Sequence, residues 1–321
     1  MPVKTQIEER KKPIVSLRAP PTAMQLHNSK LTIAHKSGEI VTIDTETKER
    51  KVLAKEKVSV TAVCQTQDIL LVGTRKGEVK SLINKSLKRI SKRHRSLIVS
   101  IDAIETETGE VEIITASADH RVHIWKLDIT ENKGKKVAHL LFLKTLYGPN
   151  TPITSSSLSQ DKKLFLCTAE LAETVRVFRL EKDTQLLFHL QKGEYALAAL
   201  FIKNNQFVVV SSTNTVYLFS TDQSEPIQSL YLETENSSEC AVSSLKLLSD
   251  STFAVGLTNG HIFILDFSQS ISVKDSMSVD AIPNDIVSTG STLYIAGGKE
   301  EKHTRFFINK TASNGLFTNT C

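Results

Sequence analysis

The chain has 321 residues, 40% hydrophobic and 23% charged, with 40 lysines and arginines against 35 acids and a net charge of +5. A chain of this size and composition can bury a core without disulfides or bound metals. No apolar run approaches the roughly 20 residues of a membrane-spanning helix, and charges occupy the N-terminal stretch where a signal peptide would be apolar. Nothing in the sequence directs the chain to secretion or to a membrane.

The cysteines indicate buried, reduced thiols. They are spaced too widely for a CxxC pair, which argues against a zinc ribbon or a thioredoxin-like site. The first three lie in apolar, strand-like surroundings, and this fits a reducing compartment. The four positions are Cys64, Cys167, Cys240 and Cys321.

Strand signals recur along nearly the whole chain. Short runs of β-branched and aromatic residues alternate with Gly, Asn, Asp and Ser, and almost no segment has the 3.6-residue spacing of an amphipathic helix. Apolar strands are each followed by a turn and an alternating strand. In chain order the alternating strands are GEIVTID, GEVKSLI, HRVHIWK, ETVRVFR, NTVYLFS, GHIFILD and KHTRFFI.

The spacing of these strands predicts the fold. Their third residues, from Ile40 to Thr304, are separated by 39, 43, 53, 41, 46 and 42 residues. A period near 40 with about four strands per unit is typical of β-propeller blades. We therefore predict one all-β domain over residues 1–321, a seven-bladed propeller with four-stranded antiparallel blades. The expected units are 19–48, 57–85, 94–130, 150–182, 193–222, 238–268 and 280–310.

The third unit resembles a WD40 repeat, in which a His begins the unit and a Ser, an Asp and a Trp follow at set offsets. Here a His, an aliphatic, a Ser and an aliphatic stand at His94, Ile98, Ser100 and Ile101, and the later positions are Ser117, Asp119 and Trp125. The resemblance implies a structural hydrogen-bond relay inside the sheet, formed by His94, Ser117, Asp119 and Trp125. We expect this relay to fasten strands together rather than to catalyse a reaction.

Catalytic and metal-binding interpretations of the same stretch are weaker. His120 and His123 are three apart on a strand and so point to opposite faces, which serves a shared ion poorly. We expect His123 to face the neighbouring blade or solvent. The sequence has no glycine-rich phosphate loop, no assignable pair of carboxylates and no F/L-R-R-G phosphoinositide motif. We therefore expect no enzyme activity, no metal, no cofactor and no membrane partner.

The ends of the chain are expected to close the ring. The last unit supplies three strands, DAIPNDIVSTG, TLYIAGG and TRFFINK, and lacks an outer one. The WD40 resemblance implies closure by a blade that mixes strands from both ends of the chain. We expect residues 5–17 to supply the fourth strand.

A basic segment, Arg75 to Arg95, is the most informative surface feature. It carries nine lysines and arginines against one acid, Glu78. Its densest part, Ser86 to Arg95, is expected to form the outer strand of the second blade and the turn into the third. Lysines on an edge strand also prevent aggregation, but this density favours an anionic partner such as RNA, or a nuclear-import signal. The candidate anion-binding residues are Lys85, Lys88, Arg89, Lys92, Arg93 and Arg95.

These features predict a non-catalytic scaffold or adaptor subunit of a multisubunit complex. The basic segment contains no aromatic residue, so we expect it to hold RNA by its phosphates. By analogy with basic WD40 proteins, the complex would act in ribosome assembly or tRNA modification. We expect an intracellular location, with the nucleus or nucleolus favoured and the cytoplasm as the alternative. Two alternatives stay open. One is a protein-only scaffold in signalling, trafficking or chromatin complexes. The other is a propeller hydrolase, which would need shifted titratable residues in a polar central channel.

Overall fold

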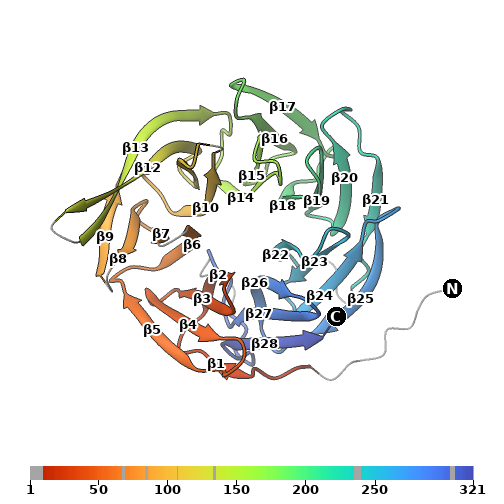
Figure 1. Cartoon of the computed structure of the whole chain (residues 1–321). Helices are drawn as coiled ribbons and strands as arrows, with labels where there is room; N and C mark the ends of the chain where they lie inside the picture. Colours follow the sequence, from red (N-terminus) through yellow and green to blue (C-terminus); the bar gives the residue numbers. More distant parts are fainter. Residues whose placement is uncertain are drawn as a thin grey trace.

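The computed structural model describes residues 10–66, 69–83, 86–106, 108–132, 135–234, 240–303 and 308–320. These residues form seven four-stranded antiparallel sheets, arranged as blades around a central opening (Figure 1). None of the described residues belongs to a helix with the length and apolarity needed to cross a bilayer. The predicted all-β, seven-bladed propeller is confirmed.

Six blades consist of four consecutive strands, ordered from the central opening to the outer rim (Figure 1). Blade 1 comprises β2 (Pro21–His27), β3 (Lys30–His35), β4 (Glu39–Asp44) and β5 (Arg50–Lys55). Blade 2 comprises β6 (Val60–Thr66), β7 (Ile69–Thr74), β8 (Val79–Ile83) and β9 (Ser86–Ser91). Blade 3 comprises β10 (Ile98–Glu105), β11 (Val111–Ser117), β12 (Arg121–Asn132) and β13 (Lys135–Tyr147).

The remaining blades continue the same order. Blade 4 comprises β14 (Ile153–Leu158), β15 (Leu164–Ala169), β16 (Thr174–Arg179) and β17 (Thr184–His189). Blade 5 comprises β18 (Ala196–Phe201), β19 (Gln206–Ser211), β20 (Thr215–Ser220) and β21 (Gln228–Tyr231). Blade 6 comprises β22 (Val242–Leu247), β23 (Thr252–Leu257), β24 (His261–Asp266) and β25 (Ser272–Ser278). Blade 7 comprises β26 (Ile282–Thr289), β27 (Thr292–Gly298), β28 (Gly315–Thr320) and β1 (Val15–Ser16).

Apolar side chains fill the space between every pair of neighbouring blades. The second strand of each blade is buried on both faces, and all six residues of β7 are inaccessible to solvent. Between blades 2 and 3, for example, Leu71 of β7 packs in one cluster with Trp125 of β12. Since each blade buries both its faces on neighbours, the blades are stable only as a closed ring.

The two ends of the chain meet in blade 7. Strand β1 pairs antiparallel with β28 and lies outside it (Figure 1). The Ile14 N–H donates to the Leu316 carbonyl at 2.8 Å, and the buried Leu17 packs with Leu316 and with Leu31 of blade 1. A strand from before blade 1 thus completes the last blade. Residues 5–9 of the expected closing segment lie outside the described residues.

The third strand of blade 7 differs from the expected one. TRFFINK was expected there, but the strand is β28, Gly315–Thr320. Leu316 packs toward blade 1 and Phe317 toward blade 6, and both are fully buried, whereas Ile308 is 52% exposed. Residues 304–307 lie outside the described residues. A strand inside a propeller blade must bury both faces, and GLFTNT does so.

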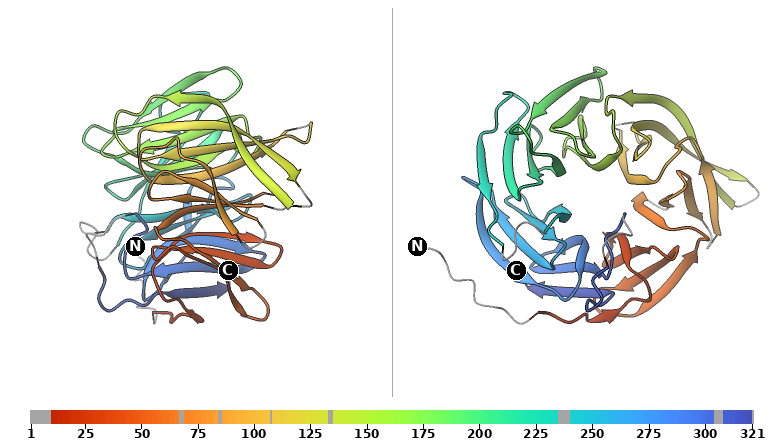
Figure 2. Two further views of the ribbon diagram at one scale, coloured as in Figure 1. Left: turned by 90° about the vertical axis from the view of Figure 1, so that its left-hand side faces the viewer. Right: turned by 180° about the vertical axis from the view of Figure 1, so that it is seen from behind.

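The blades also extend beyond the expected units. Unit 19–48, for example, ends before the outer strand β5 (Arg50–Lys55), which is polar and half-exposed. Outer strands contribute little to the core, so their apolar signal is weak. Blade 3 extends furthest, because β12 and β13 have 12 and 13 residues and project from the rim (Figures 1 and 2).

Candidate functional site

A continuous hydrogen-bond chain runs through blade 3. The Trp125 indole N–H donates to Thr115 Oγ1 at 3.0 Å, and Thr115 Oγ1 lies 2.8 Å from His94 Nε2. On its other side, His94 Nδ1 lies 3.0 Å from an oxygen of Asp119. A carboxylate only accepts, so His94 Nδ1 carries a proton and donates to Asp119. The chain therefore runs from Trp125 to Asp119 with every group paired.

Thr115 takes the place expected for Ser117. The Ser117 hydroxyl instead donates to the Ser96 carbonyl at 3.2 Å and accepts from the Asp119 backbone N–H at 3.2 Å. Ser117 and Thr115 point to the same face of β11, because alternate residues of a strand share a face. Ser117, at the strand's end, fixes the turn, while Thr115, one pair further in, lies between His94 and Trp125. The relay is therefore His94, Thr115, Asp119 and Trp125.

Asp119 also ties the turn before blade 3 to the blade itself. Its carboxylate accepts from the backbone N–H of Arg95 at 2.8 Å and of Arg121 at 3.2 Å. Burial acts to raise the pKa of Asp119, but the hydrogen bond and charge of His94 and the Arg95 N–H outweigh it, and the pKa falls to about 2. Asp119 is therefore ionised at neutral pH.

His123 belongs to this cluster, although the sequence suggested only that it faces the neighbouring blade or solvent. Its ring is buried and stacks on His94 with a centroid separation of 4.2 Å. Phe142 of β13 packs edge-on against both His123 and Trp125, and the Arg93 guanidinium lies 3.6 Å from the centre of the Phe142 ring. Burial, and next the neighbouring His94, lowers the pKa of His123 to about 4. His123 is thus neutral at pH 7.

The turn of blade 2 holds the backbone of His94. Gly77 has φ +75°, and a Cβ at this position would collide with the His94 carbonyl oxygen. Only glycine allows this approach at no steric cost. His94 is thus held by blade 2 while its ring bonds within blade 3. The relay therefore ties the chain that enters blade 3 to β11, to β12 and to the turn between them.

The basic segment lies where it was expected. Strand β9 is the outer strand of blade 2, and residues 92–97 lead to blade 3. Lys88 and Arg89 are adjacent on β9, so they project from opposite faces of the edge strand. Lys85 lies outside the described residues. We name the other five candidates, which are all exposed, the basic edge: Lys88, Arg89, Lys92, Arg93 and Arg95.

Few carboxylates neutralise the basic edge. Glu78 lies 3.4 Å from Arg89, but it also lies 3.3 Å from Lys80. Within the described ranges, no other carboxylate is within 4 Å of a cation of the basic edge. Most of this positive charge therefore faces solvent.

Comparisons with known proteins identify the type of propeller. No family model matches the sequence, and no curated protein matches it. Solved structures do match. U3-55K and the WD40 repeats of RRP9 each superpose on 95% of this chain with a TM-score of 0.78 and 16% identity, over 96% and 95% of their own chains. The WD40 β-propeller domain of Doa1 gives a TM-score of 0.69 and 14% identity, over 91% of this chain and 92% of that one.

The chain has the WD40 propeller fold. The superpositions, with TM-scores of 0.69 to 0.78, establish this architecture. Sequence identities of 14 to 16% say nothing about the molecules that the chain binds.

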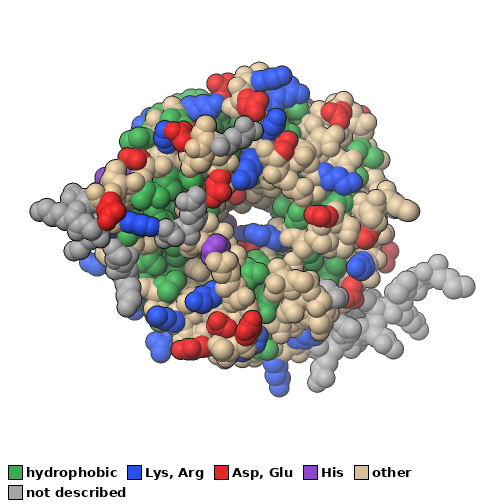
Figure 3. Space-filling view, viewed as in Figure 1, with side chains coloured by type: hydrophobic (Ala, Val, Ile, Leu, Met, Phe, Trp, Pro, Cys, Tyr) green, Lys and Arg blue, Asp and Glu red, His purple; other side chains and the backbone are tan. Residues whose placement is uncertain are grey.

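The channel of this WD40 propeller is lined by polar and apolar side chains alike. It encloses about 520 Å³ and opens through the middle of the ring (Figure 3). Burial raises the pKa of Asp102 to about 6, against the opposing charge of Lys246, whose Nζ lies 3.8 Å from Asp285. Burial, and then the charge of Lys302, lowers the pKa of His303 to about 3. Shifted titratable groups in the channel are part of what the hydrolase alternative requires.

The described part of the channel has a serine beside a carboxylate, Ser100 with Asp102, but it pairs no serine with a histidine. The Ser100 and Ser156 hydroxyls lie 2.5 Å apart, and no described histidine is hydrogen-bonded to either. A serine nucleophile needs a base within hydrogen-bond reach. Among the described residues, no three His, Cys, Asp or Glu side chains are grouped to hold a metal ion.

Two cysteines of the WD40 propeller, Cys64 and Cys167, are free thiols. Cys64 and Cys167 are buried, and Cys240 is half-buried. Burial raises the pKa of the Cys64 and Cys167 thiols to about 12, so both stay protonated and unreactive. Cys321 lies outside the described residues.

Proposed function

We propose that this propeller is a non-catalytic scaffold subunit that holds an RNA backbone on its basic edge. The observation that carries the proposal is the exposure of five cations within eight residues, from Lys88 to Arg95. Only Arg89 among them pairs with a described carboxylate, that of Glu78. Exposed cations of this density attract phosphates over a distance of about 8 Å at physiological salt.

Protection of a sheet edge does not account for the charge. Strands β17 and β21 are outer strands too, and neither contains a lysine or an arginine. The ring therefore tolerates outer edges without clustered cations. The concentration on β9 and the following turn fits an anionic partner instead.

The geometry favours phosphate contacts over base reading. Phe142 is the aromatic side chain in contact with the basic edge, and the guanidinium of Arg93 covers one face of its ring. Bases that stack on a protein need an open aromatic face. We therefore expect RNA binding with little sequence preference.

The test is RNA binding by a charge variant of the intact chain. The variant Lys88→Ala, Lys92→Ala, Arg95→Ala removes exposed cations and leaves the Arg89–Glu78 and Arg93–Phe142 contacts in place. With a fluorescein-labelled 20-mer of poly(U) at about 0.1 M KCl, we expect fluorescence anisotropy to show at least about tenfold weaker binding.

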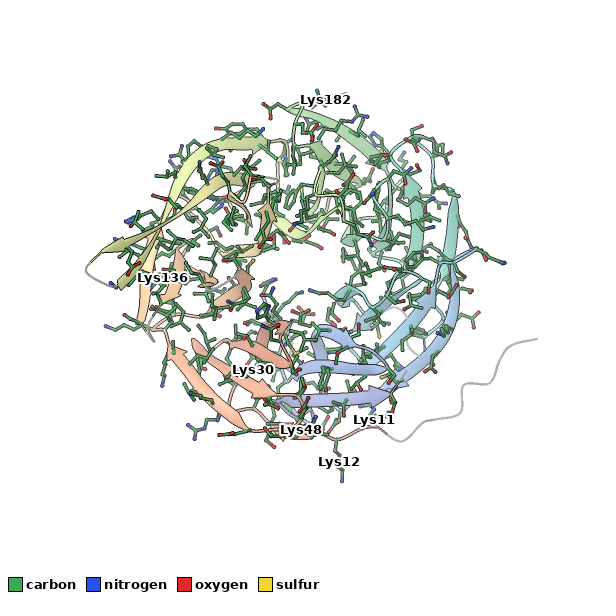
Figure 4. All side chains as sticks on the ribbon, viewed as in Figure 1. Lys11, Lys12, Lys30, Lys48, Lys136 and Lys182 are labelled. Atoms are coloured by element: carbon green, nitrogen blue, oxygen red, sulfur yellow. The ribbon has the colours of Figure 1, made fainter. Side chains whose placement is uncertain are left out.

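A matched control removes three exposed lysines elsewhere on the rim: Lys182→Ala, Lys192→Ala and Lys274→Ala (Lys182 is labelled in Figure 4). It lowers the net charge equally, so we expect less than a twofold change. Equal losses in the two variants would show that net charge, and not the basic edge, governs binding. No loss in the first variant would favour the protein-only scaffold.

The hydrolase alternative lacks a comparable observation. It has the channel, the shifted pKa values of Asp102 and His303, and a hydrogen bond between Asp102 and Ser100, but no described histidine is hydrogen-bonded to Ser100. The scaffold is therefore the function that the described residues support best.

A further inference from the structure

The free edge of β13 is unlike that of any other outer strand. β13 is the last strand in the order β10-β11-β12-β13, so one side of its backbone is unpaired within the sheet. It has 13 residues, whereas the outer strands of the other blades have between two and seven. At about 3.4 Å per residue, it offers an edge about 40 Å long.

This edge carries exposed apolar side chains. Leu141 is 50% exposed, Phe142 37%, Leu143 47% and Tyr147 67%. The register of β12 and β13 shifts so that Trp125 faces Phe142 and Ile124 faces Lys144, which leaves Leu143 without an opposite residue. Three consecutive apolar residues therefore lie at the rim. A long apolar edge strand is a template for pairing with another strand.

The surroundings of β13 are basic. Residues 121–147, the hairpin of β12 and β13, contain six lysines and arginines against two acids. Two of the six cations, Lys126 and Lys144, pair with Glu110 and Asp183 outside the hairpin, which leaves the charge of the hairpin positive. Arg121 lies opposite Tyr147 in the sheet, and Arg93 lies on Phe142. Lys136 stands on the projecting part of the hairpin (Figure 4). A second copy of this chain, paired edge to edge, would bring these like charges together. The charge favours an acidic partner.

We propose that β13 binds an extended acidic segment of a partner protein, which adds a strand to blade 3. The backbone of the segment would hydrogen-bond to the free edge of β13. Its apolar residues would cover Leu141 and Leu143, and its glutamates and aspartates would meet Arg93 and Arg121. The proposal goes beyond RNA binding, because it concerns a different strand and a different class of partner; Arg93 of the basic edge is the one residue that the two proposed surfaces share.

The test uses three synthetic 12-residue peptides labelled with fluorescein. One alternates Glu and Val, the second alternates Lys and Val, and the third is the first with N-methyl groups on alternate backbone nitrogens. Fluorescence anisotropy with the intact chain should show binding of the Glu peptide at least tenfold tighter than of the other two. Equal affinity for the Glu and Lys peptides, or full affinity for the methylated one, would overturn the proposal.

Variants locate the binding on the strand. Leu141→Ser with Leu143→Ser should weaken binding of the Glu peptide at least tenfold. Leu187→Ser on β17, which alters a residue 43% exposed on the next outer strand, should change it less than twofold. Unfolding curves of both variants establish that each is folded. Equal losses in the two variants would place the peptide elsewhere and overturn the proposal.

Two further readouts separate the alternatives. If the leucine variant lost affinity for poly(U) RNA as strongly as for the peptide, β13 would belong to the RNA surface and the proposal would be wrong. If sedimentation velocity showed a dimer that the leucine variant abolished, the occupant would be a second copy. If the leucine variant kept its RNA affinity, and the variant and the unmodified chain were both monomers, the result would support the acidic partner. This holds even if RNA bound outside the basic edge.

Discussion

The imidazole of His94 stacks on that of His123, with ring centroids 4.2 Å apart and planes inclined by 23°. His94 precedes the first strand of blade 3, and His123 lies on its third strand. The contact packs the incoming chain against the blade that it enters. Asp119 accepts a hydrogen bond from His94, whereas His123 sits beside His94 and near Arg93, and burial disfavours protonation of His123.

This pair makes stability depend on pH. Burial, and then His94, lowers the pKa of His123 to about 4 in the folded chain, against 6.5 in the unfolded one. The unfolded state therefore binds the proton more readily, so stability falls as the pH falls from 6.5 to 4. His123→Gln should remove about 2 kcal/mol of that fall in the free energy of unfolding. Urea unfolding at pH 7 and at pH 4.5 checks this. If the unmodified chain and the His123→Gln variant lost the same free energy of unfolding between the two pH values, the prediction would be contradicted.

The relay predicts a ranking of two hydroxyl deletions. Thr115→Val keeps the shape of the side chain but leaves the buried Trp125 N–H without an acceptor, so it should cost about 2 kcal/mol. Ser117→Ala removes bonds to the Ser96 carbonyl and the Asp119 N–H and should cost about 1 kcal/mol. Urea unfolding at pH 7 gives both values. A larger cost for Ser117→Ala would restore Ser117 as the relay residue.

Gly77 and Gly109 form a matched pair of glycines. Their φ angles are +75° and +76°, but a Cβ on Gly77 would collide with His94, while one on Gly109 would meet no atom within 4 Å. Gly109→Ala should cost about 1 kcal/mol for the backbone conformation alone, and Gly77→Ala about 3 kcal/mol. Equal free energies of unfolding in the two variants would mean that the close approach of Gly77 to His94 does not affect stability.

The closure of blade 7 predicts the effect of a truncation. Deletion of residues 1–18 removes β1 and the buried Leu17, and exposes the edge of β28. Because the ring is stable only when closed, the melting temperature should fall by at least about 5 °C. Ile14→Ala, which alters a side chain 46% exposed in the same segment, is the control and should have little effect. An unchanged melting temperature in the truncated chain would place the seam elsewhere.

The sequence predicts the propeller well because the inner strands must be apolar on both faces and so repeat clearly. It does not predict which hydroxyl joins the relay, because Thr115 and Ser117 share one face of β11 and only the reach of His94 distinguishes them. The strand GLFTNT was missed because TRFFINK has the stronger alternating pattern, although Leu316 and Phe317 are the buried residues.

Of the candidate surfaces, too, the sequence predicts some features and only the structure shows the others. The position of the basic segment on an outer strand follows from the repeat, since β9 comes after the three inner strands of blade 2. The contact of Arg93 with Phe142 joins residues 49 positions apart and depends on the packing of blade 2 against blade 3. The length and exposure of β13 depend on its pairing with β12, which periodicity alone does not reveal.

The most direct test of the basic edge is the salt dependence of RNA binding by the intact chain. The affinity for single-stranded poly(U), measured from about 50 to 300 mM KCl, should fall with a logarithmic slope of about 3.5, since each of the five cations of the basic edge neutralises one phosphate and contributes about 0.7. Loss of Lys88, Lys92 and Arg95 should lower that slope by about 2. A slope near zero, or the same slope in both proteins, would contradict the account.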